Sequence, residues 1–174
     1  DTISPMTYGI RVHGTQNQLL YNRIQYALVG IHVEGAESYV YKNQVVFAPR
    51  AIVLNAAPNS IVSENEISSS NIFAIRIQGG SNYTVAIKNQ ISLSYRTFVV
   101  DTSFWVNITY NRYCNNMFSS TERIGVLSTE IYENWNSFCL ESDETSTGDL
   151  LDSGDSENQV YRREHELQWL EDLQ

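Results

Sequence analysis

The chain has 174 residues, enough for one domain with a sizeable core, and its 20 acidic and 11 basic side chains give a formal net charge of −9. Eleven of the acids and two of the bases lie in residues 141–174, so residues 1–140 are neutral and offer no clustered basic face for nucleic acid. No stretch approaches the roughly 18 consecutive apolar residues of a transmembrane helix, so no membrane span is expected.

Residues 1–8 form a lead-in that Pro5 interrupts. The chain opens at Asp1 without a methionine, and we expect a processed chain or a piece of a longer one with a neighbouring segment at its N-terminus.

A repeat then runs from residue 9 to residue 116. Five pieces in it (LLYNRI, VYKNQV, VSENEI, AIKNQI and ITYNRY) carry an asparagine at the same place, at steps of 21, 22, 24 and 22 residues. These asparagines are Asn22, Asn43, Asn65, Asn89 and Asn111.

A second block lies ahead of each asparagine and reads GIRV, GIHV, AIVL and AIRI, with FVVD, beginning at Phe98, as a degraded fifth copy. Apolar side chains alternate with the others in these blocks, which is the period of a strand with one buried face. Two core columns are predicted: Ile10, Ile31, Ile52, Ile75 and Val99, and Val12, Val33, Leu54 and Ile77. Asp101 falls in the second column, where we expect the strand to bulge or end.

A period near 22 residues, with strand-like alternation and no helical segment, predicts a solenoid in which each repeat is one turn. Successive turns would stack about 4.8 Å apart as parallel strands. Leucine-rich repeats have a similar period, but their L-x-x-L-x-L consensus is absent, so we predict a parallel β-helix. We expect the asparagines to adopt left-handed backbone conformations at the turns and to form hydrogen-bonded amide ladders between turns.

The pattern of G-I-x-V followed by N-x-I, over residues 9–116, resembles the right-handed parallel β-helix superfamily, the pectate-lyase-like solenoids. The resemblance implies an all-β, right-handed parallel β-helix of about five to six turns. It also implies that an enzymatic member would bind a glycan along an outer sheet face, using Asp, Arg, Lys or His side chains. These motifs specify the fold and say very little about the activity.

The chain after the repeats of residues 1–116 divides into three segments. Residues 117–140 lose the asparagine spacing and are predicted to form an irregular closing turn or cap. Residues 141–159 hold seven acids, no bases and many Ser, Thr and Gly residues, which predicts a flexible acidic linker. Residues 160–174 are predicted to form a short amphipathic α-helix, whose stability in isolation would be marginal. We expect this helix to pack on the solenoid or to contact another subunit or a protein partner.

Cys114 and Cys139 leave two interpretations open. They form a disulfide that pins the closing segment, worth about 3 kcal/mol in an oxidising compartment, or they are two buried free thiols. The N-x-[ST] sequons at Asn82 and Asn107 would accept glycans only in a eukaryotic secretory setting, so glycosylation stays open. The aromatic side chains of the fifth repeat, including Trp105, are expected to plug the core or contact the cap.

The outward side chains of the GIRVHG sheet hold the most enzyme-like groups. One predicted column contains Arg11, His32, Val53, Arg76 and Val100, and the next contains His13, Glu34, Asn55, Gln78 and Thr102. A His/Glu/Arg cluster on this face would abstract a proton and neutralise a uronate carboxylate. Its candidate catalytic residues are His13, His32, Glu34, Arg11 and Arg76. An ordinary solvated face is the alternative interpretation.

Other chemistry has little support in the sequence. There is no acidic cluster for a calcium-assisted lyase and no paired-aspartate arrangement for hydrolysis. Neither a metal-ligand spacing nor a glycine-rich phosphate loop occurs, so neither a metal nor a cofactor is predicted.

We expect a secreted module, or one on a cell or virion surface, that acts as a structural or glycan-recognition unit of a larger protein or assembly. The alternative is a polysaccharide lyase, hydrolase or epimerase on the outer face of the GIRVHG sheet, and a third hypothesis makes residues 160–174 a docking peptide on an acidic tether.

Overall fold

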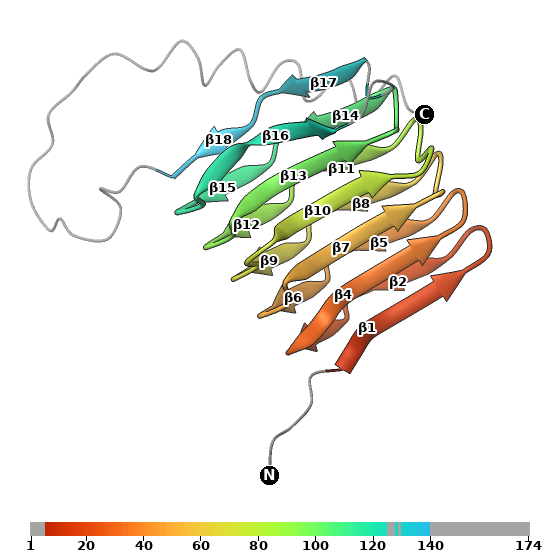
Figure 1. Cartoon of the computed structure of the whole chain (residues 1–174), viewed down its shortest axis with the longest axis horizontal. Coiled ribbons are helices and arrows are strands. Elements are labelled where there is room, and N and C mark those ends of the chain that lie inside the picture. The colour runs from red at the N-terminus through yellow and green to blue at the C-terminus, as the bar shows by residue number, and fades with distance from the viewer. Residues whose placement is uncertain (1–5, 125–127, 129, 140–174) are drawn as a thin grey trace, which may run out of the picture. The chain divides into compact units, whose positions relative to one another are not determined.

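The computed structural model describes residues 6–124, 128 and 130–139, which form a parallel β-solenoid of six turns (Figure 1). Each turn contributes one strand to each of three sheets. Sheet A contains β1 (Met6–His13), β4 (Ala27–Glu34), β7 (Arg50–Asn55), β10 (Phe73–Gln78), β13 (Arg96–Asp101) and β16 (Phe118–Ile124). Sheet B contains β2 (Gln18–Leu20), β5 (Tyr39–Tyr41), β8 (Ile61–Ser63), β11 (Val85–Ile87), β14 (Val106–Thr109) and β17 (Ile131–Asn134). Sheet C contains β3 (Arg23–Gln25), β6 (Gln44–Val46), β9 (Glu66–Ser68), β12 (Gln90–Ser92), β15 (Arg112–Cys114) and β18 (Ser137–Phe138). The predicted parallel β-helix fold is confirmed.

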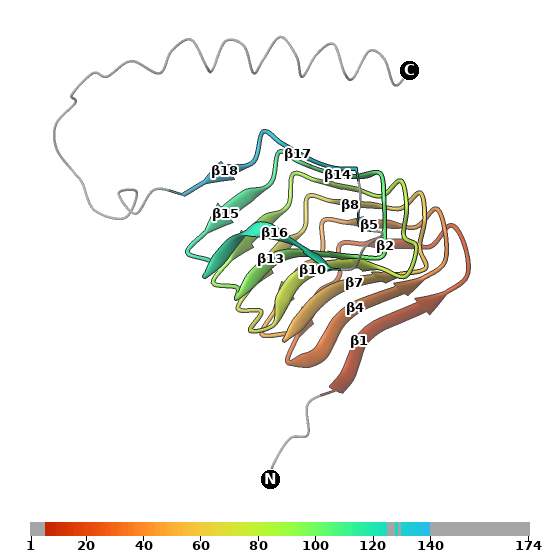
Figure 2. The ribbon, with the colours of Figure 1, turned by 45° about the horizontal axis from the view of Figure 1, so that its top comes forward.

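The core lies inside the stacked turns, with strands of the three sheets around it (Figure 2). In sheet A the register aligns two apolar columns, which are Ile10, Ile31, Ile52, Ile75 and Phe98, and Val12, Val33, Leu54, Ile77 and Val100. From the second turn onward every member of both columns has an exposed fraction of 0%. Burial of these aliphatic stacks removes apolar surface from water along the whole solenoid and is the main stabilising contribution.

The predicted register of the fifth turn is wrong by one residue. Phe98, not Val99, pairs with Ile75 and points into the core, and Asp101 pairs with Gln78 on the outer face. Because side chains alternate along a strand, a slip of one residue moves each of them to the opposite face. Asp101 therefore does not interrupt a core column, and no bulge is needed to accommodate it. The two outward columns continue with Val99 and Asp101, in place of Val100 and Thr102.

The first five strands of sheet A each depart from strict alternation once, because two successive residues face the core. Ala51 and Ile52, for example, both belong to the core cluster and are fully buried. The first residue of the pair is small in the first four turns (Gly9, Gly30, Ala51 and Ala74) and is Thr97 in the fifth. A Cβ on Gly30 would come within 2.5 Å of the Ala51 carbonyl oxygen and of Val45 Cγ1. The outward side chains before and after the pair consequently flank a hollow on the outer face of sheet A.

A ladder of asparagine amides joins the turns at the corner between sheets B and C. In each step the backbone N–H and Nδ2 of one asparagine donate to Oδ1 of the asparagine in the next turn, at 2.9–3.1 Å. The ladder contains Asn22, Asn43, Asn65, Asn89, Asn111 and Asn136. From the second member onward, Nδ2 also donates to a carbonyl of the preceding turn, as Asn89 does to Val62 at 2.9 Å.

The prediction that these asparagines adopt the left-handed conformation is wrong. A positive φ is found instead at the residue before each of them: Tyr21, Lys42, Glu64, Lys88, Tyr110 and Trp135. The preceding residue turns the chain and projects its side chain outward, while the asparagine side chain faces inward. The four inner members, Asn43, Asn65, Asn89 and Asn111, are buried, and the end members Asn22 and Asn136 are partly buried. The ladder asparagine is selected for its amide, which donates and accepts at once, and not for its backbone.

Residues 118–138 supply the sixth strand of every sheet, in the segment predicted to close the solenoid. The pairing of β16 with β13 contains a register shift between Arg96 and Phe98. A disulfide joins Cys114 to Cys139 across 25 residues, with their Cα atoms 4.9 Å apart, and ties the fifth turn to the sixth. No helix within the described residues is long and apolar enough to cross a membrane. The predicted acidic linker and C-terminal helix lie outside the described residues.

Candidate functional site

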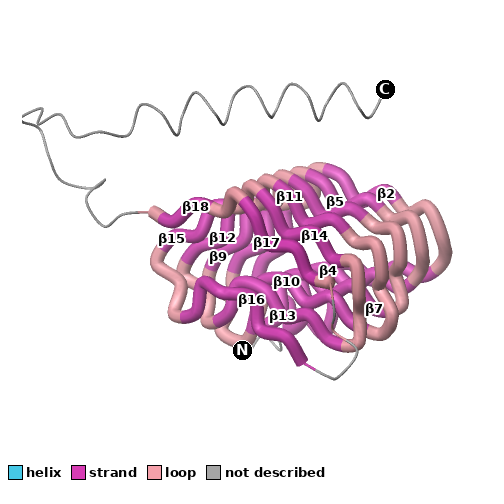
Figure 3. Tube along the Cα trace, turned by 90° about the horizontal axis from the view of Figure 1, so that it is seen from above, coloured by secondary structure: helices cyan, strands magenta, loops and turns pink. Residues whose placement is uncertain are grey.

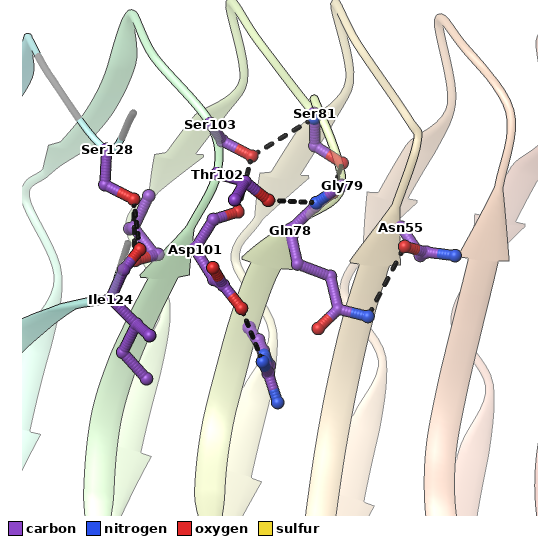
Figure 4. Close-up of polar contacts among 11 residues, drawn as sticks. Asn55, Gln78, Gly79, Ser81, Asp101, Thr102, Ser103, Ile124 and Ser128 are labelled. Carbon is purple, nitrogen blue, oxygen red and sulfur yellow. Dashed lines mark hydrogen bonds and ion pairs between the residues drawn. The ribbon is translucent and has the colours of Figure 1, made fainter. Parts of the chain in front are cut away.

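A row of polar side chains follows the outer face of sheet A, one from each of five successive turns. The row contains His13, Glu34, Asn55, Gln78 and Asp101 in register. Its members contact one another or their neighbours: Gln78 Nε2 lies 3.4 Å from Asn55 Oδ1 (Figure 4). At the same edge the Gly79 N–H donates to Thr102 Oγ1 at 3.2 Å. The alternation of each strand places these side chains on one face, and the shared register aligns them.

Four of the five predicted catalytic residues meet at the Glu34 carboxylate. Arg11 Nη2 lies 3.2 Å from Glu34 Oε1, and His13 Nδ1 lies 2.6 Å from Glu34 Oε2. His32 Nε2 lies 3.5 Å from Oε1, too far for a strong hydrogen bond but close enough for charge to matter. The side chains of Arg11 and His13 are 42% and 58% exposed, whereas that of His32 is only 12% exposed. The carboxylate is the centre of this cluster.

Arg76 is not part of that cluster. It belongs to the fourth turn, with Val53 of the third turn between it and His32 in the same outward column. Its Nη2 pairs with Asp101 Oδ2 at 2.7 Å. Sequence reasoning missed this ion pair because the register slip placed Asp101 in the core column. With correct register, stacked Arg76 and Asp101 would have been adjacent candidates for a cross-strand pair.

The pKa values of both His32 and Glu34 are lowered. Burial lowers the pKa of His32 below its usual value of 6.5; the Glu34 carboxylate acts to raise it, and the Arg11 charge acts to lower it further. Desolvation acts to raise the pKa of Glu34, but the hydrogen bond from Arg11 and the charge of His13 outweigh that effect, so the pKa lies below its usual 4.5. At neutral pH His32 is therefore uncharged and Glu34 is ionised.

Because the folded state protonates His32 less readily than the unfolded state does, acidification should destabilise the fold through this residue. The stability contribution is fully present above pH 6.5 and is lost progressively as the pH falls from 6.5 through the lowered pKa of His32. We expect His32→Gln to flatten the pH dependence of the unfolding free energy over this window, measured by denaturant titration. An NMR titration midpoint of His32 at or above 6.5 would contradict the prediction.

Two hollows lie on the same outer face. The first, of about 220 Å³, is lined by Tyr8, Val29, His32, Arg50, Val53, Phe73, Arg76 and Gln78. The second, of about 270 Å³, is lined by Tyr95, Arg96, Phe118 and Glu122. An apolar cluster of Val29, Val53, Phe73 and Val99 forms beneath the outward arginines, separate from the solenoid core. Within the first hollow His32 Nδ1 and Arg76 Nε are buried and lack a hydrogen-bond partner.

This geometry limits the chemistry available. Ionised Glu34 cannot donate a proton, and it orients the two imidazoles and the guanidinium around it. Neutral His32 has the protonation state of a general base, but its Nδ1 is buried. Within residues 6–124, 128 and 130–139, no group of three or more His, Cys, Asp and Glu side chains is placed to hold a metal ion.

The sequence also matches one family model, described as a right-handed β-helix region, over residues 2–162. The chain belongs to this family. No curated protein and no solved structure matches it. A right-handed β-helix supports a structural or carbohydrate-related module, and the fold by itself does not choose between the two.

Several features of this right-handed β-helix carried no clear sequence signal. Tyr8 and Phe73 lie ahead of the repeated block, in a position where the other turns have Val29, Arg50 and Arg96, so no residue type recurs there. The sixth ladder residue, Asn136, was missed because Glu133 replaces the apolar residue three places before it. Two signals were available: its 25-residue spacing from Asn111, and the apolar Phe138 two residues after it, which pairs with Tyr113.

Proposed function

We propose that this right-handed β-helix is a recognition module for a largely neutral polysaccharide, bound along the outer face of sheet A. The observation that carries the proposal is the polar row from His13 to Asp101, which presents one hydrogen-bonding side chain per turn on five successive turns. At about 4.8 Å per turn the row extends over about 19 Å. A regular row of this kind suits a ligand that is itself a linear repeat, with hydroxyl groups at regular intervals.

The apolar floor beside the row supports the same ligand class. Tyr8 and Phe73 line the first hollow, and Tyr95 and Phe118 line the second. Aromatic side chains pack against the C–H faces of sugar rings, while adjacent polar groups fix the orientation of the hydroxyls. Sugar rings combine apolar faces with polar edges, and this face offers both along one direction.

The charges on the face favour a neutral or weakly acidic chain over a densely anionic one. Carboxylates balance the positive charges of three arginines on this face. The ion pairs are Arg11–Glu34, Arg76–Asp101 and Arg96–Glu122. Arg50 alone among the arginines of the first hollow has no carboxylate within ion-pair distance among the described residues. A polyanion would have to displace the carboxylates from these arginines. The displaced carboxylates would then be left without a cationic partner.

Binding assays with the full chain test the proposal. Titration calorimetry should detect binding to a neutral polysaccharide and weaker binding to a densely acidic one. Asn55→Ala/Gln78→Ala should weaken the binding about tenfold, because each lost hydrogen bond contributes roughly 0.5–1.5 kcal/mol. Gln44→Ala/Gln90→Ala, on the outer face of sheet C, is the matched control and should leave affinity unchanged. No binding, or equal losses from both pairs, would overturn the proposal.

Polysaccharide cleavage is the second candidate, favoured specifically by the convergence of His13, His32 and Arg11 on Glu34. Product formation should be followed in the same samples, as the absorbance of unsaturated uronates and as new reducing ends. Turnover that His13→Ala/Glu34→Gln abolishes would establish an enzyme. Binding without turnover would support recognition alone. In either case we place the module outside the cell or on a virion surface, as part of a larger assembly, because polysaccharides of this kind are encountered there.

A further inference from the structure

The sixth turn of the solenoid differs from the other turns in the side chains that it places over the core. Its register with the fifth turn puts Thr121, Arg123 and Glu133 at inward positions. The corresponding positions of the first five turns are all apolar. Arg123 Nη2 lies 3.9 Å from Glu133 Oε1, so two charged groups meet across the end of the core. The sixth turn therefore closes the core instead of extending it.

The sixth turn also buries little apolar surface. Among its described residues, Ile131 is the one buried hydrophobic side chain, at 8% exposed. Phe138 pairs with Tyr113 of the fifth turn, but Tyr113 is 3% exposed and Phe138 is 61% exposed. Since apolar burial is the main stabilising contribution to each turn, the sixth turn should open more readily than the inner turns.

Three side-chain contacts add to the strand pairing between the fifth and sixth turns. The expectation that Trp105 plugs the core is wrong, because it has a positive φ at a corner and is 44% exposed. Its ring lies 6.0 Å from that of Tyr132 in the sixth turn instead. Asn136 Oδ1 accepts hydrogen bonds from the last inner member of the ladder. The third contact is covalent: the disulfide between Cys114 and Cys139 closes a ring around the whole sixth turn.

We propose that this disulfide is a redox latch on one end of the sheet A binding face. While it is intact the sixth turn stays closed, and its reduction lets β16, β17 and β18 open together while the inner turns remain folded. These three strands each lie at one end of their sheet, next to β13, β14 and β15 (Figure 3). A cross-link across 25 residues favours the closed turn by a factor on the order of a hundred or more.

The latch is open to thiol–disulfide exchange, because Cys114 and Cys139 are both partly exposed. A thiolate of a dithiol reductant attacks Cys114 Sγ, the S–S bond breaks, and Cys139 Sγ leaves with the electron pair and takes up a proton. The second thiol of the reductant then releases Cys114, so the protein gains two thiols and the reductant becomes a disulfide. Arg112 Nε lies 3.2 Å from Cys139 Sγ, and its charge stabilises the departing thiolate.

Opening of the sixth turn would remove one wall of the second hollow on sheet A. Tyr95 and Arg96 of this hollow belong to the fifth turn, whereas Phe118 and Glu122 lie on β16. The Tyr95 and Phe118 rings are 5.2 Å apart, and Glu122 Oε2 lies 2.6 Å from Arg96 Nε. The inference rests on the proposed polysaccharide recognition and adds its regulation. Reduction removes an aromatic contact and a carboxylate from the binding face, while the first hollow and the polar row stay in place.

Hydrogen–deuterium exchange of the full chain, before and after reduction with dithiothreitol, tests the latch. The backbone amides of Ser137 and Cys139 donate to fifth-turn carbonyls, and we expect them to exchange on the order of a hundredfold faster after reduction. Amides of the third turn should keep their rates. Cys114→Ser/Cys139→Ser should exchange fast without a reductant and should not respond to one. Because the chain has two cysteines, this variant also controls for other effects of the reductant.

Two results would overturn the latch. One is unchanged exchange in the sixth turn after complete reduction, verified by the mass of the alkylated thiols. The other is faster exchange in every turn, which would show that the disulfide supports the whole solenoid and not one end of it.

Calorimetry of the oxidised and reduced chain tests the control of binding, with dextran, β-glucan and galactomannan as the neutral probes. Reduction should weaken binding several-fold, and Phe118→Ala should weaken binding to the oxidised chain and abolish the response to reduction. Asn55→Ala/Gln78→Ala should weaken both redox forms equally. Opening without a change in affinity would overturn the regulation of the binding face. If no probe binds either form, the proposed function fails, and the exchange rates still decide whether the sixth turn opens.

Discussion

Replacing Asn89 with alanine is expected to lower the free energy of unfolding by about 3–6 kcal/mol, although the substitution removes only an amide group. Asn89 is fully buried, and its Oδ1 accepts hydrogen bonds from the backbone N–H and Nδ2 of Asn65. Its Nδ2 donates to the Val62 carbonyl and to Asn111 Oδ1. The variant removes the acceptor of the Asn65 N–H and of one Nδ2–H of Asn65, and it removes a donor to the Val62 carbonyl. Each loss costs about 1–2 kcal/mol, because Asn65 Nδ2 keeps its bond to the Val40 carbonyl.

Equilibrium denaturation of Asn89→Ala and Asn22→Ala measures this effect against an internal control. Asn22 is the first member of the ladder, is partly exposed, and contributes one side-chain bond, from its Nδ2 to Asn43 Oδ1. We expect Asn22→Ala to cost about 1 kcal/mol. Equal, small losses at the two positions would show that the ladder amides are not the buried network described above.

The ladder illustrates how far the sequence leads and where it stops. The spacing of the asparagines, with apolar residues on both sides, predicted one position per turn that repeats through the stack. It did not predict which residue turns the chain, because Tyr21, Lys42 and Glu64 share no property that marks a left-handed backbone. Asparagine was the obvious candidate on intrinsic preference, but in the structure its side chain is needed inside the corner.

The fifth turn shows a different limit. Thr97 occupies the place of Gly30 and Ala51, so the small-residue signal that marks the start of the block is lost there. Alignment by the remaining pattern then selected Phe98 as the first residue of the block and displaced every later side chain to the wrong face. The neighbouring turns, in which the small residue and the alternation agree, were aligned correctly from sequence.

The candidate site was partly accessible from sequence for the same reason. Alternation within two neighbouring turns is enough to bring His13, His32 and Glu34 to one face, and the structure places them around one carboxylate. The hollow beside them depends on the break in alternation, where two successive residues face the core. The small residue that begins the block marks this break in the first four turns. The hollow itself depends on outward side chains from four turns, which share no residue type.

The three outer faces have different properties although the repeat that builds them is the same. Inward positions are constrained by the stack, so each face is free to vary only at its outward positions. The outward side chains of sheet C are mainly polar, and sheet A combines a polar row with apolar hollows. Sheet B mixes aromatic and aliphatic side chains with polar ones such as Gln18 and Asn107. The polar row on sheet A can therefore vary without disturbing the core, since it uses no inward side chain.

Phe98→Ala is expected to destabilise the fold by about 3–5 kcal/mol. Phe98 is one of the largest fully buried side chains and packs edge-to-face on Tyr113 with centroids 6.1 Å apart. Removal of a buried phenylalanine loses its transfer free energy and leaves a cavity that the stacked turns can fill only in part. Denaturant unfolding of the full chain, with circular dichroism as the signal, measures the loss.

Val99→Ala is the matched substitution on the opposite face of the same strand. Val99 belongs to the small outer cluster, and removal of two methyl groups there should cost about 2 kcal/mol or less. The comparison tests the register directly. If Phe98 occupied the place of Ala51 and Ala74, alanine would fit that position and Phe98→Ala would be neutral or stabilising, while Val99→Ala would carry the larger loss. Such a reversed order would contradict the observed pairing of Phe98 with Ile75 and would return Asp101 to the core column.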